Sequence, residues 1–209
     1  MTDAERPLLA NLRPDLALVA GMVEPGARVL DIGCEDGALL EALVREKGVT
    51  GRGLELSQAG VNASVKRGLS VVQGDADSDL AHYPDRAFDF VVLSQTLPAT
   101  RSPDQVLSAL VRIGERAIVS FANFGHWRVR LHLLLRGRMP VTNALSRPWY
   151  ATDNIHLCTI CDFIALCEEL GIGVERAVSL DLKQRPRAIV NRRYANIFGE
   201  TGLFLLSKR

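Results

Sequence analysis

The sequence contains no apolar run long enough to cross a membrane as a helix. Such a helix needs about 20 consecutive, mostly apolar residues. The N-terminal segment Met1–Pro7 also lacks the apolar stretch of a secretory signal peptide. We therefore expect a soluble, cytoplasmic protein without a membrane partner.

Cysteine is scarce, with four residues in a chain of 209. Four unevenly spaced cysteines are too few for a disulfide framework in a chain of this size. Cys158 and Cys161 have the spacing of half a zinc site, but no second Cys or His pair at metal-ligand spacing accompanies them. We expect no metal site, two ordinary thiols at the start of a helix, and a packing role for Cys34.

Net charge is also small, at +1. A nearly balanced chain has no overall positive field that would attract nucleic acid. We therefore expect no nucleic-acid partner, while local basic patches remain open.

The most informative segment is a strand, glycine turn and helix near the start of the chain. A short aliphatic run that contains Asp31 is followed by Gly33 and Gly37, and a helical pattern begins at Ala38. This order is typical of the opening unit of a doubly wound α/β fold. Glycine allows backbone angles closed to other residues and lets a ligand approach the main chain. Because ligands of such folds bind beyond the carboxyl ends of the strands, we expect this loop to contact one.

Strand and helix patterns then alternate with short connections. The five strand patterns end near Ile32, Leu56, Gln73, Leu93 and Phe121, and two more cover residues 174–180 and 202–207. This alternation predicts a doubly wound, mostly parallel seven-stranded sheet with helices on both faces, its last strand antiparallel. The length predicts a single domain over residues 1–209, with a basic helical insertion at about 122–157.

Polar residues follow the strands at the predicted ligand edge. Glu55 ends the second strand, where a nucleoside-binding fold places a carboxylate for the ribose hydroxyls. A dinucleotide fingerprint would need glycine at position 35, which is Glu35 here, so NAD fits poorly. Ser94 and Gln95 leave the central strand beside the first loop and are candidate contacts for a ligand or substrate.

The pattern from Val29 to Gly37, with Glu55 and then Gly74-Asp75, resembles the class I S-adenosylmethionine-dependent methyltransferases. The resemblance implies a site for S-adenosylmethionine or S-adenosylhomocysteine. In that family Asp75 would accept a hydrogen bond from the adenine amine, and Ala76 would offer its backbone N–H. The implied binding residues are Asp31, Gly33, Glu35, Gly37, Glu55, Asp75, Ala76 and Ser94. The alternative is that these residues only shape the sheet.

Longer segments resemble the MetW family of bacterial methionine biosynthesis proteins. They are Val91–Leu97, Ser120–Arg130, Leu135–Val141 and Asn154–Thr159, within a resemblance that covers roughly residues 12 to 181. This implies an accessory or regulatory subunit that binds S-adenosylmethionine and supports a homoserine O-acyltransferase of the MetX type. The alternative is a methyltransferase for a small molecule, with Gln95 and His126 as catalytic candidates.

Glu35 departs from both resemblances, because glycine is usual at this position. A left-handed backbone costs about 1–2 kcal/mol for a non-glycine residue. Repulsion between this carboxylate and that of the ligand at about 4 Å would add about 1–4 kcal/mol. Attraction to the ligand's amine and sulfonium opposes this repulsion. The expected affinity therefore ranges from normal to severely weakened, and a third reading is a pocket that has lost its ligand.

The predicted insertion is rich in arginine. Five arginines and no acidic residue lie between Phe124 and Tyr150. The helix within it, which carries Trp127, Leu131, Leu134 and Leu135, is either a lid packed on the sheet or a docking surface for another protein.

A second basic run, 183–193, is either a solvated loop or half of an anion or partner site. Asn123, His126 and His156 lie where a segment covering the ligand would return, although such residues are more often structural.

Overall fold

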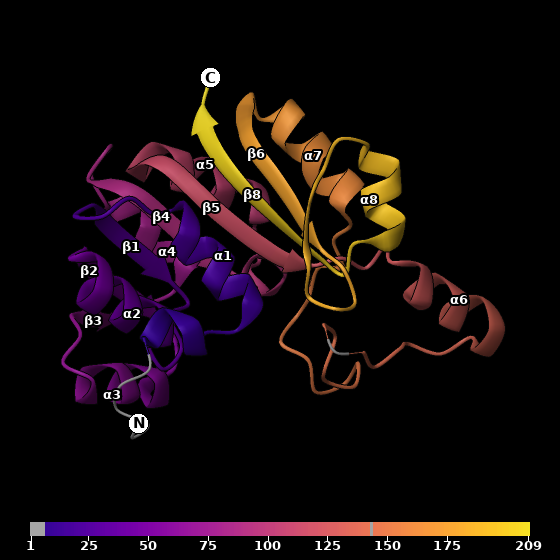
Figure 1. Ribbon diagram of the computed structural model, residues 1–209, viewed down its shortest axis with the longest axis horizontal. Coiled ribbons are helices and arrows are strands. Elements are labelled where there is room, and N and C mark those ends of the chain that lie inside the picture. Colours follow the sequence, from indigo (N-terminus) through magenta and orange to yellow (C-terminus); the bar gives the residue numbers. More distant parts are fainter. Residues whose placement is uncertain (1–6, 143) are drawn as a thin grey trace.

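One twisted sheet organises the chain (Figure 1). The computed structural model describes residues 7–142 and 144–209, so the expectation drawn from residues 1–6 lies outside the described residues. Eight strands follow in the order β3-β2-β1-β4-β5-β8-β6-β7. The strands from β3 to β5 are parallel, and β8 lies antiparallel between β5 and β6.

The first half of the chain supplies the parallel strands and their helices. It comprises α1 (Pro14–Met22), β1 (Arg28–Ile32), α2 (Ala38–Lys47), β2 (Thr50–Glu55), α3 (Gln58–Lys66), β3 (Val71–Gln73), α4 (Ala76–Asp79), β4 (Phe88–Ser94), α5 (Pro103–Ile113) and β5 (Gly114–Ala122). Short 3-10 helices occur at Leu8–Asn11, Leu80–His82 and Leu97–Ala99. Strand, glycine loop and helix thus follow one another as the sequence predicts.

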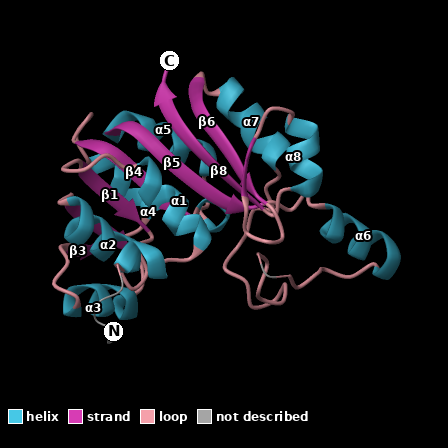
Figure 2. Cartoon of the chain, in the orientation of Figure 1, coloured by secondary structure: helices cyan, strands magenta, loops and turns pink. Residues whose placement is uncertain are grey.

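The second half departs from this regular alternation. It comprises α6 (Trp127–Arg136), α7 (Ile160–Glu169), β6 (Ile172–Leu180), β7 (Pro186–Ala188), α8 (Arg192–Phe198) and β8 (Thr201–Lys208). Figure 2 shows α6 projecting beyond the other helices, followed by a long segment without helix or strand. No helix in the described part of the chain has both the length and the apolar character needed to span a bilayer.

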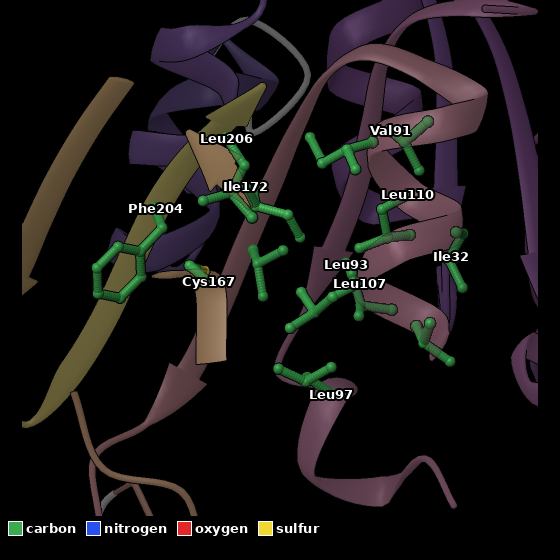
Figure 3. Close-up of a cluster of buried hydrophobic side chains, with 14 of the residues drawn as sticks. Ile32, Val91, Leu93, Leu97, Leu107, Leu110, Cys167, Ile172, Phe204 and Leu206 are labelled. Atoms are coloured by element: carbon green, nitrogen blue, oxygen red, sulfur yellow. The ribbon is translucent and has the colours of Figure 1, made fainter. Parts of the chain in front are cut away.

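Alternate residues of the central strands face two separate cores. On one face Val29, Phe90 and Ile118 pack against α1 and α2. On the other face Leu30 and Val91 pack with α5 and α7, and the labelled side chains of Figure 3 belong to this cluster. The helices therefore cover both faces of the sheet, as the alternation predicts.

The sheet has one strand more than predicted, because β7 pairs antiparallel with the end of β6. Its three residues are all exposed and begin with proline, so they carry none of the apolar alternation that identifies a strand. The sequence pattern likewise does not predict the helix α8, which begins within the second basic run. Its start signal is Asn191, whose side chain accepts hydrogen bonds from the backbone N–H groups of Arg193 and Tyr194.

Candidate functional site

The glycine loop after β1 leaves room for little beyond its own backbone. Gly33 and Gly37 have φ angles of 69° and 77°. A Cβ atom on Gly33 would lie 2.5 Å from Oγ1 of Thr96, so the backbone of the loop packs directly on Thr96, which follows β4. Thr96 is a neighbour of the site that the sequence did not single out. Its only sequence signal is its position just after Gln95.

Glu35 adopts the left-handed conformation that its position predicts, with φ of 50°. Its side chain is exposed, and its backbone N–H donates a hydrogen bond of 2.9 Å to Oε2 of Glu55. The main chain of the loop is therefore tied to the end of β2, and the additional carboxylate lies at the surface.

Glu55 is buried at the end of β2 and receives two backbone hydrogen bonds. Oε2 accepts from Glu35, and Oε1 accepts from the N–H of Ser57 at 2.8 Å. Each carboxylate oxygen can accept a further hydrogen bond. An oriented carboxylate with this remaining capacity fits a pair of hydroxyl donors.

Asp31 is the most perturbed acid of this edge. Its carboxyl is 3 % exposed and receives no hydrogen bond from the described residues. Burial, the charge of Glu35 and the charge of Glu55 together raise the pKa of Asp31 to about 7. A buried carboxylate is stabilised by a cation nearby. Asp31, Glu35 and Glu55 therefore favour a ligand that carries a positively charged group near its own hydroxyl groups.

The loop after β3 lies beside Glu55, because the N–H of Gly74 donates to the Glu55 carbonyl at 3.0 Å. Asp75 accepts from the N–H of Asp77 and lies 3.6 Å from the exposed guanidinium of Arg101. Ala76 is the first residue of α4, and the first N–H groups of a helix have no partner within it. Asp75 and Ala76 thus offer an acceptor and a donor at the same edge.

The end of β4 completes this edge. The Oγ atoms of Ser94 and Ser120 are 2.9 Å apart, so these hydroxyls join β4 to β5. Gln95 has φ of 59°, and its N–H donates to the Ser120 carbonyl at 2.8 Å. A non-glycine residue held at positive φ is a form of strain that occurs often at functional sites. Gln95 thus lies at the end of β4, directly before Thr96, which packs against Gly33 of the glycine loop.

His126 lies at the start of α6. It lines a cavity of about 490 Å³ together with residues of α6, residues 140–142 and residues 144–145. Its Nδ1 accepts from the N–H of Arg128 at 3.3 Å, and burial lowers the pKa of the imidazole. These contacts give His126 a capping role at the start of α6.

Asn123 and His156 also have clear positions. Asn123 is buried and fastens α7 and α8 to the end of β5 through four hydrogen bonds. His156 is exposed, and its backbone N–H donates to the carbonyl of Pro98 at 2.9 Å. The segment around His156 therefore returns over the loop after β4, as a covering segment would.

The cysteines have packing positions. Cys34 is buried, and burial with the nearby Asp31 raises the pKa of its thiol to about 12, which is consistent with the expected packing role. Cys158 precedes α7, and Cys161 lies in its first turn. Within residues 7–142 and 144–209, no group of three His, Cys, Asp or Glu side chains is arranged to hold a metal ion.

Replacing Glu35 by glutamine is expected to lower the pKa of Asp31 below about 7, because it removes the carboxylate with the larger charge effect of the two that raise it. An NMR titration of the Asp31 carboxyl carbon measures the change. The matched control is Asp36→Asn, which neutralises the adjacent exposed acid, paired with Arg67 at 2.6 Å. An equal shift in both variants would contradict a specific effect of the Glu35 charge on Asp31.

Comparisons with known proteins agree with this geometry. The profile of the family described as "Methionine biosynthesis protein MetW" matches residues 13–206. A bifunctional methionine biosynthesis protein MetXA/MetW from Rhodopirellula baltica is 30% identical over 186 residues, which are 85% of this chain. The chain spans only 30% of the length of that curated relative.

Solved structures with the same fold include S-adenosylmethionine-dependent methyltransferases. One from Thermotoga maritima, described as a possible histamine N-methyltransferase, has a TM-score of 0.69 and 16% identity, covering 97% of this chain and 92% of that one. Another from Mesorhizobium loti has a TM-score of 0.68 and 17% identity, covering 95% and 99%. The chain therefore has the Rossmann-like fold of these enzymes.

Proposed function

Since the chain belongs to the MetW family of methionine biosynthesis proteins, we propose that it supports a homoserine O-acyltransferase and binds S-adenosylmethionine at the edge formed by β1, β2 and β4. The observation that carries the first part is the relative whose name joins MetXA to MetW in one polypeptide. Fusion keeps two modules at high effective concentration, which is useful when they act together. We propose the same functional association for this chain.

The residues at the edge suit S-adenosylmethionine as the ligand. Its ammonium group would pair with Asp31, and its ribose hydroxyls would donate to Glu55, which has acceptor capacity left. Asp75 and the N–H of Ala76 would hold the adenine. When bound, the ligand's sulfonium makes its methyl group transferable to a nucleophile. The side chain of Glu35 lies at the surface, where solvent weakens its repulsion of the ligand's carboxylate.

A regulatory role requires coupling between ligand and partner. If S-adenosylmethionine changes the affinity for the acyltransferase, the acyltransferase must change the affinity for S-adenosylmethionine by the same factor. The ligand is a later product of methionine metabolism, so such coupling would connect supply to demand.

The test is acyl transfer to homoserine by the acyltransferase of the same organism, measured with and without this chain. We expect the chain to raise the rate severalfold and added S-adenosylmethionine to change the effect. The control is the Asp31→Asn variant, which should retain the activation and lose its response to S-adenosylmethionine. An acyltransferase whose rate is unchanged by the chain would refute the proposal.

The second candidate function is methyl transfer to a small molecule, favoured by the strained Gln95 at the end of β4. Methyl transfer depends mainly on orienting the nucleophile toward the methyl group, so positioning alone supplies much of the catalysis. Formation of S-adenosylhomocysteine in the same assay mixtures would support this candidate.

A further inference from the structure

The helix α6 presents an unusual surface. Successive helical residues are about 100° apart around the axis, so Trp127, Leu131, Leu134 and Leu135 fall within a sector of about 100°. Val129 lies about opposite to this sector and is the buried residue of the helix. Leu134 and Leu135 are 81% and 72% exposed. The helix therefore packs against the rest of the protein through the side that carries Val129, and its apolar stripe faces solvent.

This exposure decides between the two roles that the sequence left open. A lid would bury its apolar stripe on the sheet. In Figures 1 and 2, α6 instead projects away from the sheet and its covering helices. The stripe forms one wall of the cavity of about 490 Å³, whose opposite wall includes Pro140, Val141 and Leu145. The exposed stripe therefore lies beside a concave surface, and this combination suits the binding of another protein.

The exposed charged side chains of α6 and of the turn after it are all arginines, and the carboxyl in the lining of the cavity beside them, that of Glu200, is buried. Arg128, Arg130, Arg136 and Arg138 are exposed, and no carboxylate of the described residues forms a salt bridge with them. Arg130 and Arg128 lie at the two margins of the stripe by their helical positions. A complementary surface therefore has an apolar centre and carboxylates at its rim.

We propose that α6 is the docking element for the acyltransferase, and that its apolar stripe enters a groove of that enzyme bordered by acidic side chains. This inference rests on the proposed function, because the partner is the one named there. Association of two copies through α6 is disfavoured, since it would bring the arginines of both copies together. An anionic membrane matches the charges, but a flat bilayer does not fit the concave wall beside the stripe.

The experiment measures binding of the acyltransferase to immobilised wild-type chain, to Leu134→Glu and to Val65→Glu. Leu134→Glu places a carboxylate at the most exposed apolar position of the stripe, where we expect binding to weaken about 30-fold or more. Val65 is 52% exposed on α3 and provides the matched control, with binding expected within about twofold of wild type. Because Leu134 is mostly solvent-exposed, both variants should melt at the temperature of the wild type.

The outcomes separate the two proposals. If the wild type neither binds nor activates the acyltransferase, the proposed function fails and the docking surface fails with it. If the wild type binds and Leu134→Glu binds equally well, only the docking surface is overturned. It is also overturned if Leu134→Glu abolishes binding to phosphatidylserine vesicles, or dissociates a homodimer, while acyltransferase binding stays intact.

A charge reversal tests the rim independently. Arg128→Glu, at one margin of the stripe, should weaken acyltransferase binding and reduce its dependence on salt, since one attraction across the interface becomes a repulsion. A salt dependence equal to that of the wild type would contradict an acidic rim on the partner.

Discussion

Replacing Asp31 by asparagine is expected to make the ligand-free protein more stable at pH 8 and to abolish tight binding of S-adenosylmethionine. Burial, Glu35 and Glu55 raise the pKa of this carboxyl from 3.8 to about 7 in the folded protein. The folded state therefore binds the proton more tightly than the unfolded state. The contribution of Asp31 to the free energy of unfolding is greatest below about pH 4. It is lost as the pH rises through about 7, where the folded carboxyl ionises.

The size of the effect follows from the same shift. One pKa unit corresponds to about 1.4 kcal/mol, so keeping Asp31 ionised at pH 8 costs up to about 4 kcal/mol of unfolding free energy. Asparagine has nearly the same shape and does not ionise. Urea unfolding at pH 4 and pH 8 should show a variant that is about 2–4 kcal/mol more stable than wild type at pH 8 only. An identical difference at both pH values would show that Asp31 is not responsible.

Binding should respond in the opposite direction. The ligand's ammonium pairs with the ionised carboxylate, so binding below pH 7 releases a proton and weakens about tenfold per pH unit. Loss of one partner of a buried charged pair costs about 2–5 kcal/mol, which is about 30-fold or more in affinity. Calorimetry in two buffers of different ionisation enthalpy detects the proton. A wild type whose affinity is the same at pH 6 and pH 8 would contradict the ammonium contact.

Replacing Asn123 by alanine is expected to lower the free energy of unfolding by about 3–5 kcal/mol. Its Nδ2 donates to the carbonyls of Asn196 and Gly199 at 2.9 and 2.7 Å. Its Oδ1 accepts from the N–H groups of Gly125 and Ile160 at 3.0 and 3.2 Å. Alanine would leave four backbone groups without this partner in a site that is 3% exposed.

The comparison for Asn123 is Asn191→Ala, which removes an exposed asparagine with two hydrogen bonds at the start of α8. Loss of an N-cap costs about 1 kcal/mol. Urea unfolding of both variants should therefore separate them clearly. Equal losses would show that the buried network around Asn123 relaxes or admits water.

The sequence was sufficient where structure depends on neighbours along the chain. The alternation of strands and helices predicts the doubly wound sheet, and the structure has it. The left-handed backbone at Glu35 followed from the loop pattern and is present. Each of these features depends on a few consecutive residues.

The parts that could not be predicted depend on contacts between distant residues. Thr96 contacts the glycine loop only because β1 and β4 pair in the sheet. Asn123 was a candidate for a ligand-covering role, but its partners lie up to 76 positions away in the chain. Asp77 accepts from the backbone N–H groups of Arg101 and Ser102, which lie 24 and 25 positions away in the chain. No local pattern records such pairings.

The position of β8 has a consequence for synthesis on the ribosome. This strand supplies the hydrogen-bond partners of both β5 and β6, which do not pair with each other. The nascent chain can therefore assemble β1 to β5 early, while β6 has no sheet edge to join until residues 201–208 have emerged. Until then Phe163 of α7 can pack against Phe121 of β5 but lacks its second aromatic partner, Phe204 of β8. The last strand made is thus the one that completes folding, and a pause in translation before residue 201 would leave this half of the protein exposed to chaperones and proteases.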